Sequence, residues 1–180
     1  MTAETTTSHL EGIDAAALDK LSCAAKDDPS TGRKTLKAKT VCEAGFRNMN
    51  YVRDLEPVLI SEPSQLLGDN SAPNPTEMAL GALGSCISVG LLANATARGV
   101  TLSKIEVNLE GDIDISAVWG TGDLDTEKAL GVTDVRVNIV MDGDADEATL
   151  EEIHQSAMDW SPVVNTFKRP VQFESELTVG

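Results

Sequence analysis

Cys86 is the residue of this chain with the clearest capacity for chemistry. It lies in the sequence Gly84-Ser85-Cys86-Ile87, within a run of 20 consecutive uncharged residues from Met78 to Ala97. A cysteine attacks electrophiles such as peroxides as the thiolate, and a free thiol with a pKa of about 8.5 is only a few per cent thiolate at neutral pH. Nucleophilic chemistry at Cys86 therefore requires a neighbouring group that favours the thiolate.

Two local effects do not provide this activation. The helix macrodipole acts only within the terminal turns, and Cys86 lies far from both ends of the apolar run. The aliphatic neighbours Leu83, Ile87 and Leu91 disfavour the charged form. A guanidinium that hydrogen-bonds to the sulfur would favour the thiolate by about 1.5–3 kcal/mol. Without such a partner Cys86 is a small apolar core residue, and this interpretation stays open.

The sequence around Cys86 predicts a long helix with a defined start and end. Asn74-Pro75-Thr76-Glu77 combines an N-cap, a proline at the first helical position and a capping-box glutamate. Arg98-Gly99 supplies a cation followed by a C′ glycine. The length would allow a membrane span, but the caps and the glycines favour a helix that is buried on every side at the centre of a soluble fold.

The segments on both sides of this helix predict an α+β fold. Alternation of apolar and polar residues predicts half-buried strands, and Cys42 has the parity of a core residue in the first of them. Asp144-Ala145-Asp146-Glu147 predicts the start of a second helix and Ser161-Pro162 that of a short third one. We therefore expect helices packed on a mainly antiparallel sheet. The expected strands are 36–42, 47–53, 58–60, 105–110, 134–141 and 171–179.

Two segments lie outside this scheme. Residues 1–32 form an N-terminal extension with an expected amphipathic helix over 10–26, which leaves 33–180 as the main domain. The glycine-rich and acidic segment 119–131 is expected to be a loop between two strands. The sequence assigns no function to either segment.

The charge of the chain limits its partners. Lys and Arg number 14 against 29 Asp and Glu, for a formal net charge of -15. Such a surface repels the phosphates of nucleic acids and of anionic membranes, so we expect neither as a partner. The first nine residues contain no cationic start and no apolar block, and they therefore do not resemble a signal peptide.

The remaining reactive side chains do not form a recognisable motif. Cys23, Cys42 and Cys86 give neither a CxxC motif nor a disulfide framework, which favours a reducing cytoplasm. His9 and His154 are the only histidines, too few for a His-based metal cluster or a nucleophilic triad. The sequence also lacks a GxGxxG motif and a P-loop. We predict no metal and no cofactor.

A resemblance to a known family connects these features. Asn74-Pro75-Thr76-Glu77, then an Ala/Gly/Leu helix that reaches Gly84-Ser85-Cys86, then Ala97-Arg98-Gly99-Val100 and a strand that begins Ile105-Glu106-Val107, resemble the OsmC/Ohr superfamily. The resemblance covers residues 35–180. It implies an intertwined homodimer, each subunit built on a strongly curved sheet around a long central helix, with active sites at the subunit interface.

The resemblance also implies a chemistry. In the peroxidase branches of the superfamily, a cysteine at the position of Cys86 is the thiolate that attacks organic hydroperoxides, and a second cysteine then resolves the sulfenic acid as a disulfide. That second cysteine stands before Pro-Val, where this chain has Ser161 in the segment Asp159-Trp160-Ser161-Pro162-Val163. A serine cannot form a disulfide, and Ser-Pro is also a standard start of a helix. Both interpretations of Ser161 stay open.

Two further family positions are matched less closely. The carboxylate of the hydroperoxide reductases falls at Thr76, so the nearby acid Glu77 is the candidate, with its capping-box role as the alternative. The family's reactive arginine comes from an early strand, where Arg47 and Arg53 share one face by the strand period. We favour Arg47 because it follows the predicted turn at Gly45. A solvated strand arginine is the alternative.

Two functions of different class remain at this point. The first is a thiol-dependent reductase of small organic hydroperoxides that uses a single peroxidatic cysteine and an external thiol. The second is a non-catalytic OsmC-like dimer that keeps the fold and a pocket for a small ligand. The two differ in whether Cys86 is activated.

Overall fold

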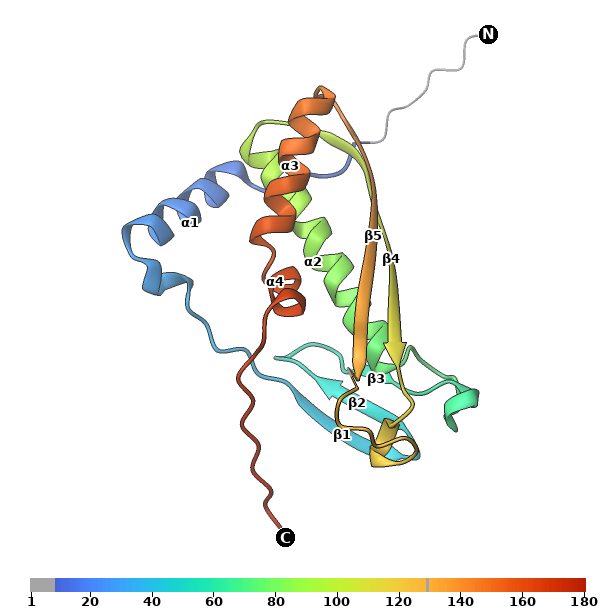
Figure 1. The fold of residues 1–180 in the computed structure, drawn as a ribbon. Helices are drawn as coiled ribbons and strands as arrows, with labels where there is room; N and C mark the ends of the chain where they lie inside the picture. The colour runs from blue at the N-terminus through green and yellow to red at the C-terminus, as the bar shows by residue number, and fades with distance from the viewer. Residues whose placement is uncertain (1–8, 129) are drawn as a thin grey trace. The chain divides into compact units, whose positions relative to one another are not determined.

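The computed structural model describes residues 9–128 and 130–180 and has an α+β fold, as predicted (Figure 1). The helices are α1 (Ala15–Asp27), α2 (Pro75–Ala97), α3 (Glu147–Trp160) and α4 (Pro162–Lys168). The strands are β1 (Lys39–Ala44), β2 (Arg47–Tyr51), β3 (Val58–Ile60), β4 (Leu102–Asp114) and β5 (Gly131–Gly143).

The chain forms two compact units, which we describe separately. The site unit contains Ser85–Glu106, Val140–Gly180 and the described residues up to Ile13. The sheet unit contains Asp14–Gly84 and Val107–Ile139. Helix α2 and the strands β4 and β5 each contribute residues to both units.

An antiparallel three-stranded sheet in the order β1-β2-β3 organises the sheet unit. The tight turn between β1 and β2 contains Gly45, whose φ of 54° lies in the left-handed region that favours glycine. The first half of α2 packs on β4 in the same unit, since a Cβ on Gly111 would lie 3.1 Å from the side chain of Leu80. This close approach places the start of α2 against the strand.

The second half of α2 packs against α3 in the site unit, where Figure 1 shows the two helices side by side. A Cβ on Gly90 would lie 3.2 Å from the Cβ of Ala157, so the absence of a side chain at position 90 allows the contact. The fully buried apolar side chains next to it form the core of this unit. They are Ile87, Leu91 and Ala95 on α2, Leu102 on β4 and Ile153 on α3.

The predicted caps of α2 are confirmed. The Glu77 amide donates to Asn74 Oδ1 and the Asn74 amide donates to Glu77 Oε2, both at 2.8 Å, which is a complete capping box. At the other end Gly99 has a φ of 69°, and the amide of Val100 donates to the carbonyl of Ala95. Local sequence therefore sets both ends of the helix.

The prediction that α2 is buried on every side is wrong for the single chain. Val89 is 68% exposed, and Ala82 and Ser85 are also exposed. By length and composition α2 could cross a membrane, a test that the core helix of a soluble protein also passes. The uncharged sequence revealed that the helix has no polar face, but it could not reveal what covers each face.

The predicted strand over 171–179 is also absent from the single chain. Residues 169–180 have no regular secondary structure, and Figure 1 shows the C-terminal segment as an extended coil. Its apolar side chains are solvent-exposed, with Phe173 at 93% and Leu177 at 85%. The alternating pattern was read correctly as extended chain, but a strand also needs a hydrogen-bonded neighbour.

The helix of the N-terminal extension begins later than predicted. Asp14 is the N-cap of α1, and its side chain accepts hydrogen bonds from the amides of Ala16 and Ala17. The preceding residues are not helical, and the Leu10 amide donates to the carbonyl of Leu102 at 2.9 Å. Helix α1 has no buried residue.

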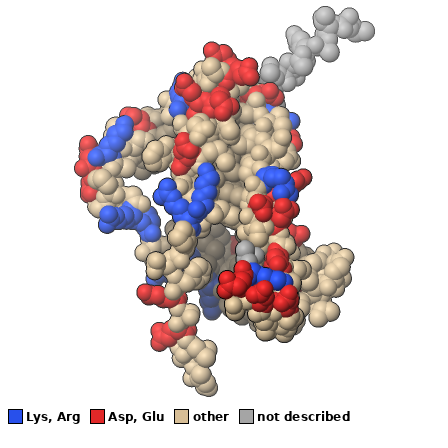
Figure 2. Space-filling view, in the orientation of Figure 1, with Lys and Arg blue, Asp and Glu red and all other residues tan. Residues whose placement is uncertain are grey.

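Acidic side chains dominate the charge of the surface. Figure 2 shows them in several patches on one face, some with cationic side chains beside them. On the β4–β5 hairpin, Arg136 forms ion pairs with Glu110 and Asp112, and this guanidinium lowers the pKa of Asp112. Exposed pairs of this kind contribute little to stability, so we assign this cluster no site.

The contact between α2 and α3 predicts different outcomes for two glycine substitutions in α2. Gly81→Ala should stabilise the fold by about 0.8–1 kcal/mol through helix propensity, because a Cβ at Gly81 meets nothing within 4 Å. Gly90→Ala should lose this gain to crowding with Ala157 and be less stable than Gly81→Ala by about 1 kcal/mol or more. Urea unfolding of both variants measures the difference, and equal stabilisation would contradict the proposed packing.

Candidate functional site

The Cys86 thiol and the Ser161 hydroxyl meet in the site unit. Ser161 Oγ donates a hydrogen bond to Cys86 Sγ at a distance of 3.2 Å. Ser161 is buried, with 4% of its surface exposed, whereas Cys86 is partly accessible. The structure thus places the serine to which the resemblance assigns the resolving position directly against the cysteine.

The packing of α2 on α3 explains this contact. Gly90 of α2 touches Ala157 of α3. Cys86 lies one turn before Gly90, and Ser161 lies one turn after Ala157. Because the two helices run antiparallel, these turns face each other. The small side chains at the crossing therefore determine how close the hydroxyl comes to the thiol.

Ser161 is the single residue between two helices. Its amide donates to the carbonyl of Ala157 at the end of α3, and its hydroxyl accepts from the amide of Val164 in the first turn of α4 at 3.2 Å. Pro162 occupies the first position of α4. The capping interpretation is confirmed, and the same hydroxyl also contacts Cys86.

The other two cysteines, Cys23 and Cys42, are free thiols in the part of the chain that the structure describes. Cys23 is exposed on α1 and Cys42 is exposed on β1. The prediction that Cys42 fills the core is wrong for the single chain, because every residue of β1 is exposed. An alternating pattern in the sequence cannot show whether another element covers the strand.

Glu77 uses its carboxylate in the capping box described above, which confirms that interpretation. Burial and the nearby negative charge of Glu77 raise the pKa of Glu62, whose Oε2 atom is buried without a hydrogen-bond partner. Thr76, at the family's carboxylate position, is half-buried. A catalytic role for Glu77 stays a prediction.

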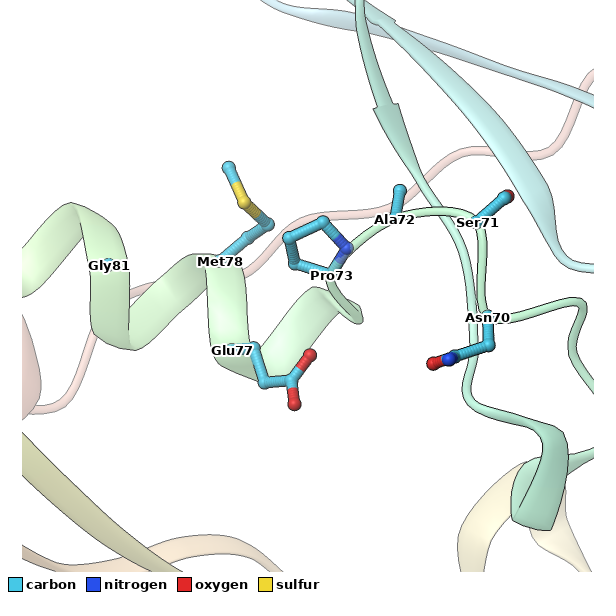
Figure 3. A pocket seen from close by; sticks show the side chains of 7 residues that line it. All are labelled: Asn70, Ser71, Ala72, Pro73, Glu77, Met78 and Gly81. Carbon is cyan, nitrogen blue, oxygen red and sulfur yellow. The ribbon is translucent and has the colours of Figure 1, made fainter.

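A shallow pocket of about 560 Å³ lies beside the start of α2. In Figure 3 the side chains of Glu77 and Asn70 extend to the same side, whereas Met78 extends to the other side of the helix. The lining mixes these polar groups with small apolar ones. The lining residues are Asn70, Ser71, Ala72, Pro73, Glu77, Met78 and Gly81.

Arg47 forms an ion pair in the sheet unit that the sequence did not suggest. Its Nη1 donates to Asp69 Oδ2 at 2.9 Å and to Ser71 Oγ at 2.8 Å. Asp69 Oδ1 also accepts from the hydroxyls of Ser61 and Ser71, each at 2.6 Å. These hydrogen bonds, with those from the serines largest, hold the pKa of Asp69 well below its usual range.

The two candidate arginines do not share a strand. Strand β2 ends at Tyr51, and Arg53 has a φ of 53° in the turn that follows. The expectation that Arg47 and Arg53 point to one face of the strand is therefore wrong. Arg47 lies in the sheet unit and Cys86 in the site unit, and a role of Arg47 at the thiol stays a prediction.

Among residues 9–128 and 130–180, no three His, Cys, Asp or Glu side chains are arranged to hold a metal ion.

The sequence analysis missed the role of Asp69 in organising its neighbours, because Gly68-Asp69-Asn70-Ser71 has the composition of an ordinary turn. The only signal in the sequence was the local repetition of turn-forming polar residues. Their donors converge on one carboxylate only once the chain is folded.

Comparison with known proteins identifies the family. Residues 68–176 match the family model described as OsmC-like protein. The chain belongs to this family. No curated protein sequence matches this OsmC-like chain.

Several solved structures share the fold of this OsmC-like protein. An OsmC-like protein from Mycoplasma pneumoniae is 15% identical with a TM-score of 0.63, over 75% of this chain and 88% of that one. An OsmC-like protein of unknown function from Vibrio cholerae is 16% identical with a TM-score of 0.60, over 74% and 94%. An organic hydroperoxide resistance protein OsmC from Legionella pneumophila is 18% identical with a TM-score of 0.54, over 75% and 90%. At these identities the similarity establishes the fold alone.

The Asp69 cluster predicts a specific loss of stability in acid. Because the pKa of Asp69 is lowered in the folded state, its contribution is fully present above the unfolded pKa of about 3.9 and is lost as the pH falls below it. Asp69→Asn should lower the thermal midpoint at pH 7, and its difference from wild type should shrink below about pH 4. Asp54→Asn, in the exposed turn after β2, is the control. A constant difference across the pH range would contradict the ion-pair account.

Proposed function

We propose that this OsmC-like protein reduces organic hydroperoxides with Cys86 as its one peroxidatic cysteine and an external thiol as the reductant. The observation that carries the proposal is the 3.2 Å contact between the partly accessible Cys86 sulfur and the buried Ser161 hydroxyl. Family membership and the presence of organic hydroperoxide resistance proteins among the structural neighbours support it. A small thiol as reductant fits the reducing cytoplasm that the sequence predicts.

The reaction has two stages. The Cys86 thiolate attacks one peroxide oxygen, so that an S–O bond forms, the O–O bond breaks and the alkoxide leaves and is protonated to the alcohol. An external thiol then attacks the sulfenic acid sulfur, forming a mixed disulfide and releasing water. A second thiol frees Cys86 and leaves as the external disulfide. In total one hydroperoxide and two thiols give one alcohol, one water and one disulfide.

We further propose that the active form is a homodimer. A single chain exposes Val89 in the middle of α2 and the apolar side chains of its C-terminal segment. The exposure of several large apolar side chains on one chain favours an interface with another subunit. A partner subunit would cover these groups and give the C-terminal segment a strand to pair with.

A second candidate is a non-catalytic dimer that binds a small ligand. The observation that favours it is the pocket beside the start of α2, whose lining combines Glu77 and Asn70 with apolar residues. The ion pair of Arg47 with Asp69 adds support, because it engages the arginine that the family resemblance assigns to the thiol. This candidate requires no reaction at Cys86.

Treatment with one equivalent of an organic hydroperoxide should convert Cys86 to the sulfenic acid without an intrasubunit disulfide. Ser161 offers no thiol to resolve it, so turnover should depend on added small thiol and decline under excess peroxide as sulfinic acid accumulates. Dimedone labelling and peptide mass spectrometry measure both products. A Cys86 that survives excess hydroperoxide as a free thiol would refute the peroxidase proposal and leave the ligand-binding dimer.

Ser161→Cys is the matched variant for this experiment. The hydroxyl already lies 3.2 Å from the Cys86 sulfur, so a thiol introduced at position 161 would be next to Cys86, and a disulfide forms if the two side chains meet disulfide geometry. Peptide mass spectra of the oxidised variant should show a disulfide between positions 86 and 161. A wild-type disulfide from Cys86 to Cys23 or Cys42 would contradict the proposed dependence on an external thiol.

Light scattering in dilute solution should give the mass of a dimer. Phe173→Asp should shift the population toward the monomer, because a charge on this side chain, 93% exposed in the single chain, would be buried at the interface. Leu124→Asp, at a side chain between η3 and β5 that is also exposed in the single chain, is the control and should leave the mass unchanged. A folded, cooperative wild-type monomer would rule out the dimer.

A further inference from the structure

We propose that the Ser161 hydroxyl is a catalytic hydrogen-bond donor that holds Cys86 in its thiolate form. This inference rests on the proposed function in taking the Cys86 sulfur as the reacting atom. It gives Ser161 a role of its own, because the residue that cannot resolve the oxidised sulfur instead prepares the reduced sulfur for attack.

The hydrogen bonds around Ser161 determine the direction of the contact. A serine hydroxyl has one proton to donate and two lone pairs that accept. One lone pair accepts the amide of Val164 at 3.2 Å, and the proton points to Cys86 Sγ at 3.2 Å. The sulfur is therefore the acceptor in this contact. A thiolate is the better acceptor, since hydrogen bonds to charged groups are stronger than those to neutral ones.

The surroundings hold this donor in place. Ser161 is 4% exposed, and its hydroxyl is tied to α4 by the bond from Val164. A rotation of the Ser161 side chain that moves its oxygen away from the sulfur would break both hydrogen bonds in a buried place, which is costly. A fixed donor aimed at a reacting atom needs no reorganisation when the charged form appears.

A hydroxyl at this position has a further advantage over a thiol. A cysteine at position 161 would be converted to a disulfide in every cycle, and it would have to be reduced before it could donate again. Organic hydroperoxides do not oxidise an alkyl hydroxyl under these conditions, so Ser161 keeps its hydrogen bond to Cys86 through repeated cycles. The serine therefore suits an enzyme that depends on an external thiol.

The rate of Cys86 alkylation by iodoacetamide tests this proposal without any peroxide. The measurement uses the full-length chain with Cys23→Ser and Cys42→Ser, so that Cys86 is the only thiol, over pH 5 to 10. Ser161→Gly and Ser161→Ala should each slow alkylation at pH 7 by about tenfold, equivalent to about 1.4 kcal/mol. They should also move the midpoint of the pH profile up by about one unit, with equal rates at pH 10. Ser161→Thr, which keeps a hydroxyl, should stay within about threefold of the parent.

The same variants separate the hydroxyl's effect on the thiol from its role as an N-cap. Glycine is tolerated at an N-cap and alanine is not, so thermal unfolding should show Ser161→Ala as less stable than Ser161→Gly. If Ser161→Ala is alkylated more slowly than Ser161→Gly, in the order of their stabilities, the effect is structural and the proposal is overturned. If both variants are slowed equally relative to the parent, the missing hydroxyl is the cause.

Two further outcomes decide between this proposal and its alternatives. In the first outcome, the Ser161 variants are alkylated at the parent's rate and Arg47→Ala is alkylated more slowly. This result would assign the activation of Cys86 to the arginine and overturn the role of Ser161. In the second outcome, the Ser161 variants are alkylated slowly but the wild-type protein does not react with organic hydroperoxide. This result would support Ser161 as the hydrogen-bond donor and refute only the proposed peroxidase function. The inference and the proposed function can thus fail independently.

Discussion

The close approach of α2 and α3 is the constraint on which the site depends. The glycine at position 90 lets Ala157 pack directly on the backbone of α2, since an added Cβ would lie only 3.2 Å from the Cβ of Ala157. Interiors are densely packed, and a shift of a few tenths of an ångström at one contact passes to its neighbours. The core of the site unit closes around this crossing, and the distance between Cys86 and Ser161 follows from it. The glycine lowers the intrinsic helix propensity of α2, and the packing it allows offsets that cost.

Two of the candidate catalytic residues are engaged in structural interactions in the single chain. Glu77 completes the capping box of α2, and Arg47 forms an ion pair with Asp69. These interactions satisfy backbone amides and charges near the start of α2 and on β2. In the described part of the site unit, Cys86 and Ser161 form a contact between a thiol and a hydroxyl that has a clear chemical capacity.

Local sequence rules predicted most of the elements, because caps, turns and periodicity depend on residues close in the chain. The capping box before α2, the glycine after it and the Ser-Pro start of α4 are of this kind. The errors arose where the outcome depends on distant contacts. Residues 171–179 have a strand pattern but no neighbour to pair with in the described chain, and the parity of Cys42 could not show that every residue of β1 is exposed. The donors on Asp69 come from Arg47 on β2, from Ser61 after β3 and from the nearby Ser71, and the spacing in the sequence does not encode the first two contacts. The contact between Cys86 and Ser161 followed from the family resemblance, whereas the direction of its hydrogen bond required the structure.

The single residue between α3 and α4 also ties the ends of both helices to the surroundings of the thiol. Ser161 ends α3 with its backbone amide, and its hydroxyl both caps α4 and touches the Cys86 sulfur. Its side chain is almost fully buried, so a larger side chain at this position would find little space. A substitution of Ser161 therefore affects the end of α3, the start of α4 and the contact with the thiol together.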